Sequence, residues 1–364
     1  MKLVIFGLTV SSSWGNGHAT LWRGLIRALT ALSVEVTFFE RDVPYYARHR
    51  DLAMLPGGEL VLYPDWASVA ARARAEAAEA DAVIVTSYCP DGRAASALAM
   101  EVARRPVFYD MDTPVTLARL AAGDRVDYLP EGGLSGFDLV LSYTGGEALV
   151  RLQKELGARR ALPLYGHVDP ELHRPVPADE RFRCDLSYLG TFAADRQGAV
   201  EALFAVPARL RPEQRFILGG SGYDGAFPWS DNIFFLDHVA PRDHGAFFAS
   251  SRLTLNATRG DMAQMGYCPS GRLFEAAACG APILTDAWEG LELFFEPGRE
   301  ILTGRTTEDA LAALDLCDGE LAAIAAAARE RTLDEHTSAH RAAQLVGYLE
   351  GSARAPFADA AQQA

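Results

Sequence analysis

The 364-residue sequence has few cysteines, and none of them are closely spaced. The absence of a C-x-x-C pair among its five cysteines argues against a disulfide framework or a cysteine-based zinc site. No apolar run approaches the roughly 18 residues that a membrane-spanning helix needs, and the N-terminus enters a strand pattern without signal-peptide features. We therefore expect a cytoplasmic protein without an integral membrane segment.

Positive charge is also scarce, because 34 lysines and arginines stand against 48 aspartates and glutamates, for a net charge of -14. The arginines are scattered and form no basic block. Such a chain repels a phosphate backbone, so we expect no nucleic-acid partner larger than a mononucleotide. The length, together with 49% hydrophobic residues, predicts a globular protein of two domains.

Short apolar runs alternate with helical patterns up to about residue 315, which is typical of parallel sheets with crossover helices. The helical patterns include leucines recurring every three or four residues from Leu21 to Leu32 and an alanine-rich stretch near Ala67–Ala80. The predicted strands are Leu3–Gly7, Val34–Phe39, Ala82–Thr86, Pro106–Tyr109, Leu139–Ser142, Asp185–Leu189, Arg215–Leu218, Ile233–Leu236, Leu253–Asn256, Pro282–Thr285 and Glu300–Leu302.

Prolines and a glycine interrupt this alternation near the middle of the chain and indicate a linker. The expected divisions are an N-terminal domain at 1–165, a linker at 166–180, a second domain at 181–335 and a C-terminal helix and tail at 336–364. The helix pattern lies around His340–Leu349, and we expect the alanine- and glutamine-rich tail to fray. The chain is thus predicted to form two similar α/β halves, with a ligand cleft between them.

Ligands of open parallel sheets bind beyond the carboxyl ends of the strands. The first strand of the second half ends in Gly190 and Thr191, a small turn that suits a phosphate, and Arg196 follows about one helical turn later. A later strand is followed by a loop that carries His238 and Val239. These residues are therefore candidates for binding a phosphorylated ligand.

The most informative segment is PSGRLFEAAACGAPILTDAWEGLELFFEPGREIL, which begins at Pro269. Ser270 suits a helix start, where free amides attract a diphosphate and Arg272 adds a fixed charge. Glu275 lies on the same helical face as Arg272, where a carboxylate can accept hydrogen bonds from both hydroxyls of a ribose. This spacing predicts a nucleotide site.

The segment resembles the donor-binding region of glycosyltransferases with the GT-B fold, particularly glycosyl transferases group 1 (family 4-like) and their CgeB-like branch. The shared pattern is S-x-R-x-F-E-A-x-A-C-G-A-P-I-L-T-D, then G and F-x-P-G-x-E-I-L. Gly190-Thr191 with Arg196 and the GHVDP motif at Gly166–Pro170 also stand at the family's usual places. The resemblance implies a GT-B fold, with two Rossmann-like domains facing each other across a cleft.

By this resemblance the protein transfers a sugar from a nucleotide sugar, most frequently UDP-linked in the family, to an acceptor that the sequence does not identify. The nucleotide sugar is a co-substrate, and neither a cofactor nor a metal is implied. Glu275 would bind the ribose, Ser270 and Arg272 the diphosphate, and the His238-Val239 loop the base. Many relatives carry another glutamate eight residues before the ribose-binding one, where this chain has Tyr267. Donor sugar, retaining or inverting stereochemistry and oligomeric state stay open.

The first half offers the loop SSSWGNGHAT between a strand and a helix. Its glycines permit close approach of the backbone to a ligand, and we expect Trp14, Asn16 and Gly17 to line the acceptor side. His18 suits a general base if the reaction inverts the anomeric centre, because an ordinary imidazole pKa matches that task. The alternative for His18 is a capping or packing role.

The motif DMDTP places Asp110 and Asp112 after a strand of the first half. A D-x-D pair can hold a divalent cation on a diphosphate, but a cleft-lining or acceptor-contacting role is favoured here. His49, His238 and His244 have no sequence spacing that indicates convergence on a metal.

Three other functions compete with sugar transfer. An NAD-dependent oxidoreductase would use the glycines after the first strand and Glu40 at the end of the second for the adenosine ribose, but Thr20 stands where its fingerprint needs a third glycine. A second alternative is a non-enzymatic sugar-binding protein with two lobes. Such proteins are usually exported, whereas the N-terminus of this sequence has no signal-peptide features. A nucleotide-sugar epimerase of the same fold would turn over donor without an acceptor.

Overall fold

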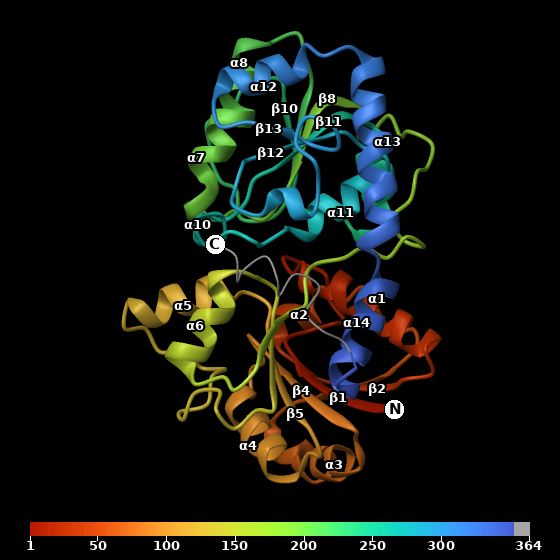
Figure 1. Cartoon of the computed structure of the whole chain (residues 1–364). Helices are drawn as coiled ribbons and strands as arrows, with labels where there is room; N and C mark the ends of the chain where they lie inside the picture. Colours follow the sequence, from red (N-terminus) through yellow and green to blue (C-terminus); the bar gives the residue numbers. More distant parts are fainter. Residues whose placement is uncertain (353–364) are drawn as a thin grey trace. The chain divides into compact units, whose positions relative to one another are not determined.

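The computed structural model describes residues 1–352 (Figure 1). The chain divides into two compact units: unit 1 comprises Met1–Tyr165 with the chain from Ser338 onward, and unit 2 comprises Gly166–Thr337. The segment expected to be a linker, 166–180, therefore groups with unit 2, and the C-terminal helix groups with unit 1. The tail expected to fray lies, from residue 353 onward, outside the described residues.

Unit 1 contains, within residues 1–352, a parallel seven-stranded sheet of order β3-β2-β1-β4-β5-β6-β7. Its strands are β1 (Lys2–Gly7), β2 (Glu35–Arg41), β3 (Glu59–Tyr63), β4 (Ala82–Thr86), β5 (Pro106–Asp110), β6 (Leu139–Ser142) and β7 (Ala161–Pro163). The five strands predicted for this half are confirmed. The two edge strands, β3 and β7, were missed because β3 is half exposed and begins with a glutamate, and β7 is three residues long and ends in a proline.

Helices cover both faces of this sheet (Figure 1). They are α1 (His18–Ala31), α2 (Pro44–Ala47), α3 (Trp66–Glu79), α4 (Gly92–Val102), α5 (Thr113–Ala121), α6 (Glu147–Leu156) and α14 (Ser338–Glu350). The leucine periodicity and the alanine-rich stretch correspond to α1 and α3, and the Asp65 side chain caps α3 by accepting the amide of Ser68. The pairs α1–α14 and α3–α4 pack together, so the C-terminal helix completes the core of unit 1.

Unit 2 contains, among the described residues, a parallel sheet of order β10-β9-β8-β11-β12-β13. Its strands are β8 (Cys184–Leu189), β9 (Phe216–Gly219), β10 (Ile233–Leu236), β11 (Ser251–Asn256), β12 (Ile283–Thr285) and β13 (Leu302–Thr303), which confirms the strands predicted for this half within a residue or two at most ends. The helices are α7 (Gln197–Val200), α8 (Val206–Leu210), α9 (His244–Ala249), α10 (Gly260–Met265), α11 (Gly271–Ala278), α12 (Thr307–Leu314) and α13 (Asp318–Glu335), with a π-helical turn at Glu201–Ala205.

The parallel register gathers the strand ends in each unit. Phe6 of β1 pairs with Phe39 of β2 and with Val85 of β4, so the loops after these strands leave the sheet at one edge. The same holds in unit 2, where Leu189 of β8 pairs with Gly219 of β9. All the sequence-predicted site residues lie at one of these two edges or in the first turns of the helices that follow.

The described part of the chain contains no helix with the length and apolar character needed to cross a bilayer. All five cysteines lie within residues 1–352 and carry free thiols, in line with the absence of a disulfide framework.

Candidate functional site

In unit 1, the loop between β1 and α1 is held by the buried carboxylate of Glu40 at the end of β2. One oxygen accepts the hydroxyls of Thr9 and Ser11 at 2.7 and 2.5 Å, and the other accepts the amides of Val10 and Ser11 at 2.7 and 2.9 Å. Each oxygen therefore already accepts two hydrogen bonds from the chain itself. The residue that a dinucleotide-binding protein would use for adenosine ribose is here a structural anchor, which argues against the oxidoreductase alternative.

A second carboxylate fixes the other side of the loop. Asp51 receives both terminal guanidinium nitrogens of Arg23 at 2.7 and 3.0 Å, and the amide and hydroxyl of Ser13 at 3.0 and 2.8 Å. Burial acts to raise the pKa of Asp51, but the bonds from Arg23 and Ser13 hold it below its usual value. Arg23 also donates to the carbonyl of Val10, so its side chain joins the two sides of the loop.

The expected acceptor-side residues differ in their surroundings. The side chain of Asn16 is buried. Its amide nitrogen donates to the carbonyl of Thr9 and its oxygen accepts the amide of His18, so it joins two parts of the loop. Trp14 is half-buried and stacks on His49, with ring centroids 4.1 Å apart and planes at 11°. Gly17 is exposed, and no heavy atom lies within 4 Å of the place where a Cβ would stand. Asn16 thus shapes the loop, whereas Gly17 leaves open space at the start of α1.

The structure brings together His18 and Asp112, which lie far apart in the sequence of the first half. The Nε2 atom of His18, at the start of α1, lies 3.5 Å from Oδ2 of Asp112, which immediately precedes α5. Both side chains are partly exposed, at 20% and 14%. An imidazole that a carboxylate holds in one orientation can take a proton from a hydroxyl on its other side. The sequence suggested each residue, but it gave no sign that they form a pair.

Asp110 has a different role from Asp112, because it is fully buried. Burial, together with the neighbouring charge of Asp112, raises the pKa of Asp110 to about 7, against the opposing effect of hydrogen bonds from the Asp112 amide, Thr116 and Ser87. One of its oxygens accepts the amide of Asp112 at 3.1 Å. Because Asp110 is buried, the DMDTP motif does not offer two exposed carboxylates to a metal ion.

In unit 2, the turn after β8 is built by close backbone contact with the turn after β9. Gly190 donates its amide to the carbonyl of Gly219, and a Cβ on Gly220, whose φ is 142°, would stand 2.2 Å from the carbonyl oxygen of Gly190. The guanidinium of Arg196 donates to the carbonyl of the exposed Thr191. Gly190, Thr191 and Arg196 thus form one compact turn at the carboxyl edge of the sheet.

The helix α11 begins as its sequence predicted. The hydroxyl of Ser270 accepts the amide of Arg272 at 3.3 Å as the N-cap, and the amides of the first turn lie at the carboxyl edge of the sheet. The backbone just before this helix is unusual, because Gly266 and Tyr267 have positive φ values of 70° and 49°. Tyr267, at the position where many of the glycosyltransferases that the segment resembles carry a glutamate, donates its amide to the carbonyl of Glu289 at 2.6 Å.

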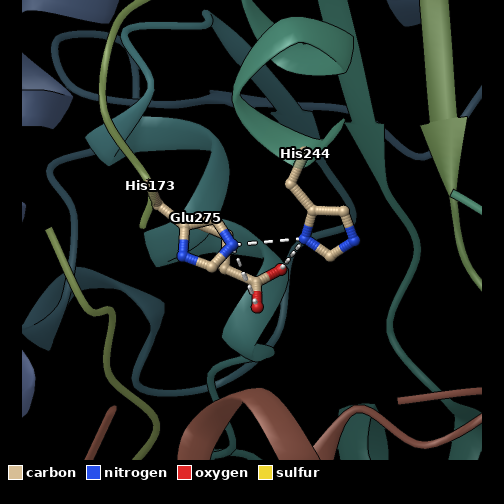
Figure 2. A group of neighbouring side chains, drawn as sticks. All are labelled: His173, His244 and Glu275. Atoms are coloured by element: carbon tan, nitrogen blue, oxygen red, sulfur yellow. Dashed lines mark hydrogen bonds and ion pairs between the residues drawn. The ribbon is translucent and has the colours of Figure 1, made fainter. Parts of the chain in front are cut away.

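Glu275, one turn into α11, is buried but remains ionised. Arg272 donates a hydrogen bond to its Oε2 atom, and the imidazoles of His173 and His244 lie beside it (Figure 2). Burial acts to raise the pKa of Glu275, but the charge of Arg272 and the hydrogen bond that it donates hold this pKa well below its usual value. The carboxylate is therefore a permanent hydrogen-bond acceptor at neutral pH, which is what binding a pair of hydroxyls requires.

The histidines beside Glu275 were not recognised as site residues from the sequence. His173 Nε2 lies 3.2 Å from His244 Nδ1, and His244 Nε2 lies 3.2 Å from the carbonyl oxygen of Val239. Burial lowers the pKa of both histidines, that of His244 to about 3. His173 follows the GHVDP motif by three residues, and only its position near this motif could have signalled it.

The same three side chains have the spacing of a potential metal site. His173, His244 and Glu275 each offer a ligand atom, and these atoms lie within 4.8 Å of one another. Two histidines and a glutamate are a known zinc ligand set. His244 therefore does converge with other potential ligands, which its sequence spacing did not reveal. Arg272, however, donates to the same carboxylate, so a metal here would lie beside a fixed positive charge.

Comparison with solved structures defines the fold. Sucrose-phosphate synthase from Thermosynechococcus elongatus has a TM-score of 0.69 at 15% identity, over 96% of this chain and 98% of that chain. Anabaena Alr3699/HepE in complex with UDP and glucose has a TM-score of 0.65 at 17% identity, over 96% and 100%. A putative UDP-N-acetylglucosamine 2-epimerase from Listeria monocytogenes has a TM-score of 0.56 at 15% identity, over 97% and 98%. The fold is GT-B, as the sequence predicted.

A family model matches most of unit 2 and part of α14. Residues 196–347 match the model of a family described as glycosyl transferase-like. The match includes Arg196, the His238-Val239 loop and the whole of α11. No curated protein matched the chain by sequence.

The buried carboxyl of Asp110 predicts a pH-dependent stability. The folded protein keeps a proton on Asp110 up to about pH 7, whereas the unfolded chain releases it near the ordinary value of 3.8, so stability falls as the pH rises through this window. Asp110→Asn removes this loss. Between pH 5 and pH 8 we expect the unfolding free energy of the variant to fall by about 3 kcal/mol less than that of the wild type. Thermal unfolding of both proteins across this range measures the difference.

The matched control for this experiment is Asp138→Asn, the same replacement at an exposed position. It should leave the pH dependence unchanged. An Asp110→Asn profile parallel to that of the wild type would contradict the protonated state of Asp110.

Proposed function

We propose that the protein is a glycosyltransferase that moves a sugar from a nucleotide sugar to an acceptor hydroxyl. UDP-linked sugars are the first donors to test. The observation that carries this proposal is the buried but ionised Glu275, which lies one turn into α11 beside Arg272, within the residues that match the glycosyl transferase-like family. The structures of HepE with UDP and with UDP-glucose support a uridine nucleotide as the first candidate.

In this proposal, the carboxyl edge of unit 2 binds the nucleotide. Glu275 accepts the ribose hydroxyls, the first-turn amides of α11 with Ser270 and Arg272 bind the diphosphate, and the loop of His238 and Val239 contacts the base. The amides carry a partial positive charge, because they have no partners within the helix. Gly190, Thr191 and Arg196 would line the phosphate side of the site.

Two arginines would exchange partners when the donor binds. In the structure, Arg272 donates to Glu275 and Arg196 donates to the carbonyl of Thr191. A diphosphate carries more negative charge than a carbonyl oxygen or a single carboxylate, so it is the stronger partner for both guanidinium groups. Turning Arg272 toward the diphosphate would also uncover the carboxylate of Glu275 for the ribose.

We assign the proton transfer to unit 1. His18, oriented by Asp112, would take the proton from the acceptor hydroxyl, whose oxygen then forms the bond to the anomeric carbon. The bond from that carbon to the diphosphate oxygen breaks, and the resulting negative charge is stabilised by Arg272 and the α11 amides. This assignment implies inversion at the anomeric centre, and it uses Trp14 and Gly17 as neighbours of the acceptor.

The proposal also covers the need for a metal, the type of donor sugar and the location of the protein. Because Arg272, Arg196 and helix amides supply positive charge for the diphosphate, we propose a metal-independent reaction without a further cofactor. A hexose donor, membership of the CgeB-like branch, a cytoplasmic location and the absence of a nucleic-acid partner are proposed on sequence grounds. The likeness to a putative 2-epimerase supports a second candidate, donor epimerisation, which would proceed without an acceptor.

Glu275→Gln tests the donor site. Removing the charge while keeping the shape should weaken UDP binding by about 10- to 100-fold, because a hydrogen bond to a charged group contributes about 1.5–3 kcal/mol. Calorimetric titration with UDP measures this change. Glu308→Ala, at an exposed position of α12, is the control and should bind UDP like the wild type. An unchanged affinity in Glu275→Gln would refute the ribose assignment.

His18→Ala tests the base. We expect turnover to fall by about 10²- to 10⁴-fold, the usual contribution of a general base, while the Kd for UDP stays within about twofold of the wild type. UDP release from the sugar nucleotide that stabilises the protein most in a thermal-shift screen provides the assay. Asp112→Asn should cause a smaller fall, because the proton acceptor, His18, is still present. Unaltered turnover in His18→Ala would remove His18 from the mechanism.

A further inference from the structure

The cluster of His173, His244 and Glu275 is built from three separate parts of unit 2. His173 lies in the segment before β8, His244 begins α9, and Glu275 projects from α11 (Figure 2). All three side chains are only 2–3% exposed. Burying two imidazoles beside a carboxylate is costly unless their polar atoms are matched, so the hydrogen-bond directions within the cluster are informative.

The direction of each hydrogen bond follows from the carbonyl of Val239. A carbonyl oxygen only accepts, so His244 Nε2, 3.2 Å away, carries the hydrogen. A neutral His244 then has a bare Nδ1, and His173 Nε2, at 3.2 Å from it, must donate. The resulting chain runs from His173 to His244 and on to the loop that carries Val239.

The two hydrogen-bonded rings also form the surroundings of the two carboxylate oxygens of Glu275. Glu275 Oε1 lies 3.8 Å from His173 Nε2, and Oε2 lies 3.7 Å from His244 Nδ1 and accepts a bond from Arg272. Each oxygen therefore faces a different ring. With one buried ring packed against each oxygen, at 3.7 and 3.8 Å, the carboxylate has little room to turn, so the rings restrict its plane.

We propose that His173 and His244 are positioning residues, which as a neutral hydrogen-bonded pair fix the carboxylate plane of Glu275 for the two ribose hydroxyls and link it to the base-contacting loop at Val239. The inference rests on the proposed function, because it assumes that Glu275 binds the ribose. A carboxylate held in one plane accepts two neighbouring hydroxyls without the entropy loss of ordering it at the moment of binding.

The test compares UDP with 2′,3′-dideoxy-UDP, which lacks both hydroxyls. Calorimetry should show that the wild type prefers UDP by at least about tenfold, as expected for hydrogen bonds to a charged acceptor. In His173→Leu we expect this preference to fall below about threefold, with an unchanged affinity for the dideoxy nucleotide. His173→Gln can donate from its amide nitrogen at a similar place and should recover part of the preference. His244→Leu should behave like His173→Leu.

A purely structural role for the histidines would give a different pattern. It would lower the affinities for both nucleotides in parallel and would leave the preference for UDP intact, which would overturn the proposal. The same conclusion would follow if Glu275→Gln and His173→Leu reduced the preference additively, because positioning through Glu275 requires that the double variant lose no more than Glu275→Gln alone.

Further outcomes distinguish the positioning role from the proposed ribose binding and from a metal site. If the wild type binds UDP without any preference over the dideoxy nucleotide, the ribose assignment within the proposed function fails and the positioning role fails with it. If it shows the preference and the His173 and His244 variants keep it, only the positioning role fails. Metal analysis of the purified protein should find no bound zinc, and one zinc per chain that is lost in His173→Leu would make the cluster a metal site and overturn the proposal.

Discussion

The parallel pairing of the strands in both described sheets decides where this protein can carry chemistry. Parallel strands release their connecting loops at one edge, and helices then start there with unpaired amides. In unit 1 this edge collects the β1–α1 loop, Asp110 and Asp112, and in unit 2 it collects the turn after β8 and the start of α11. Polar groups that are far apart in the sequence thus become neighbours within each unit.

Two buried glutamates at these edges have different hydrogen-bond partners, and we therefore assign different roles to the two units. Glu40 is satisfied by hydroxyls and amides of its own loop, so it stabilises that loop and leaves no acceptor capacity for a cofactor ribose. Glu275 is kept ionised by Arg272 and flanked by two histidines. One of its partners is the side chain of Arg272, which in the proposed function turns toward the diphosphate. The two units share an architecture, and in our proposal it is Glu275 of unit 2, not Glu40 of unit 1, that exchanges its partner for a ligand.

The sequence was sufficient for the fold and for the elements that carry the site, because apolar periodicity and cap residues are local signals. It did not reveal β3 and β7, whose edge positions need less apolar surface. It suggested His18 and Asp112 separately but not as a pair, and it missed His173. These contacts depend on tertiary packing that no local pattern encodes. The β1–α1 loop resembles a dinucleotide-binding turn in sequence, but in the structure the carboxylate of Glu40 accepts hydrogen bonds from the loop itself.

The central claim is that the carboxyl edge of unit 2 binds the nucleotide. Hydrogen exchange with and without UDP, read by mass spectrometry, tests it most directly, because a bound ligand slows local opening of the segments it contacts. The account predicts increased protection in residues 189–196, 236–244 and 269–276. Protection confined to the loop at residues 8–18, with no change in unit 2, would contradict it.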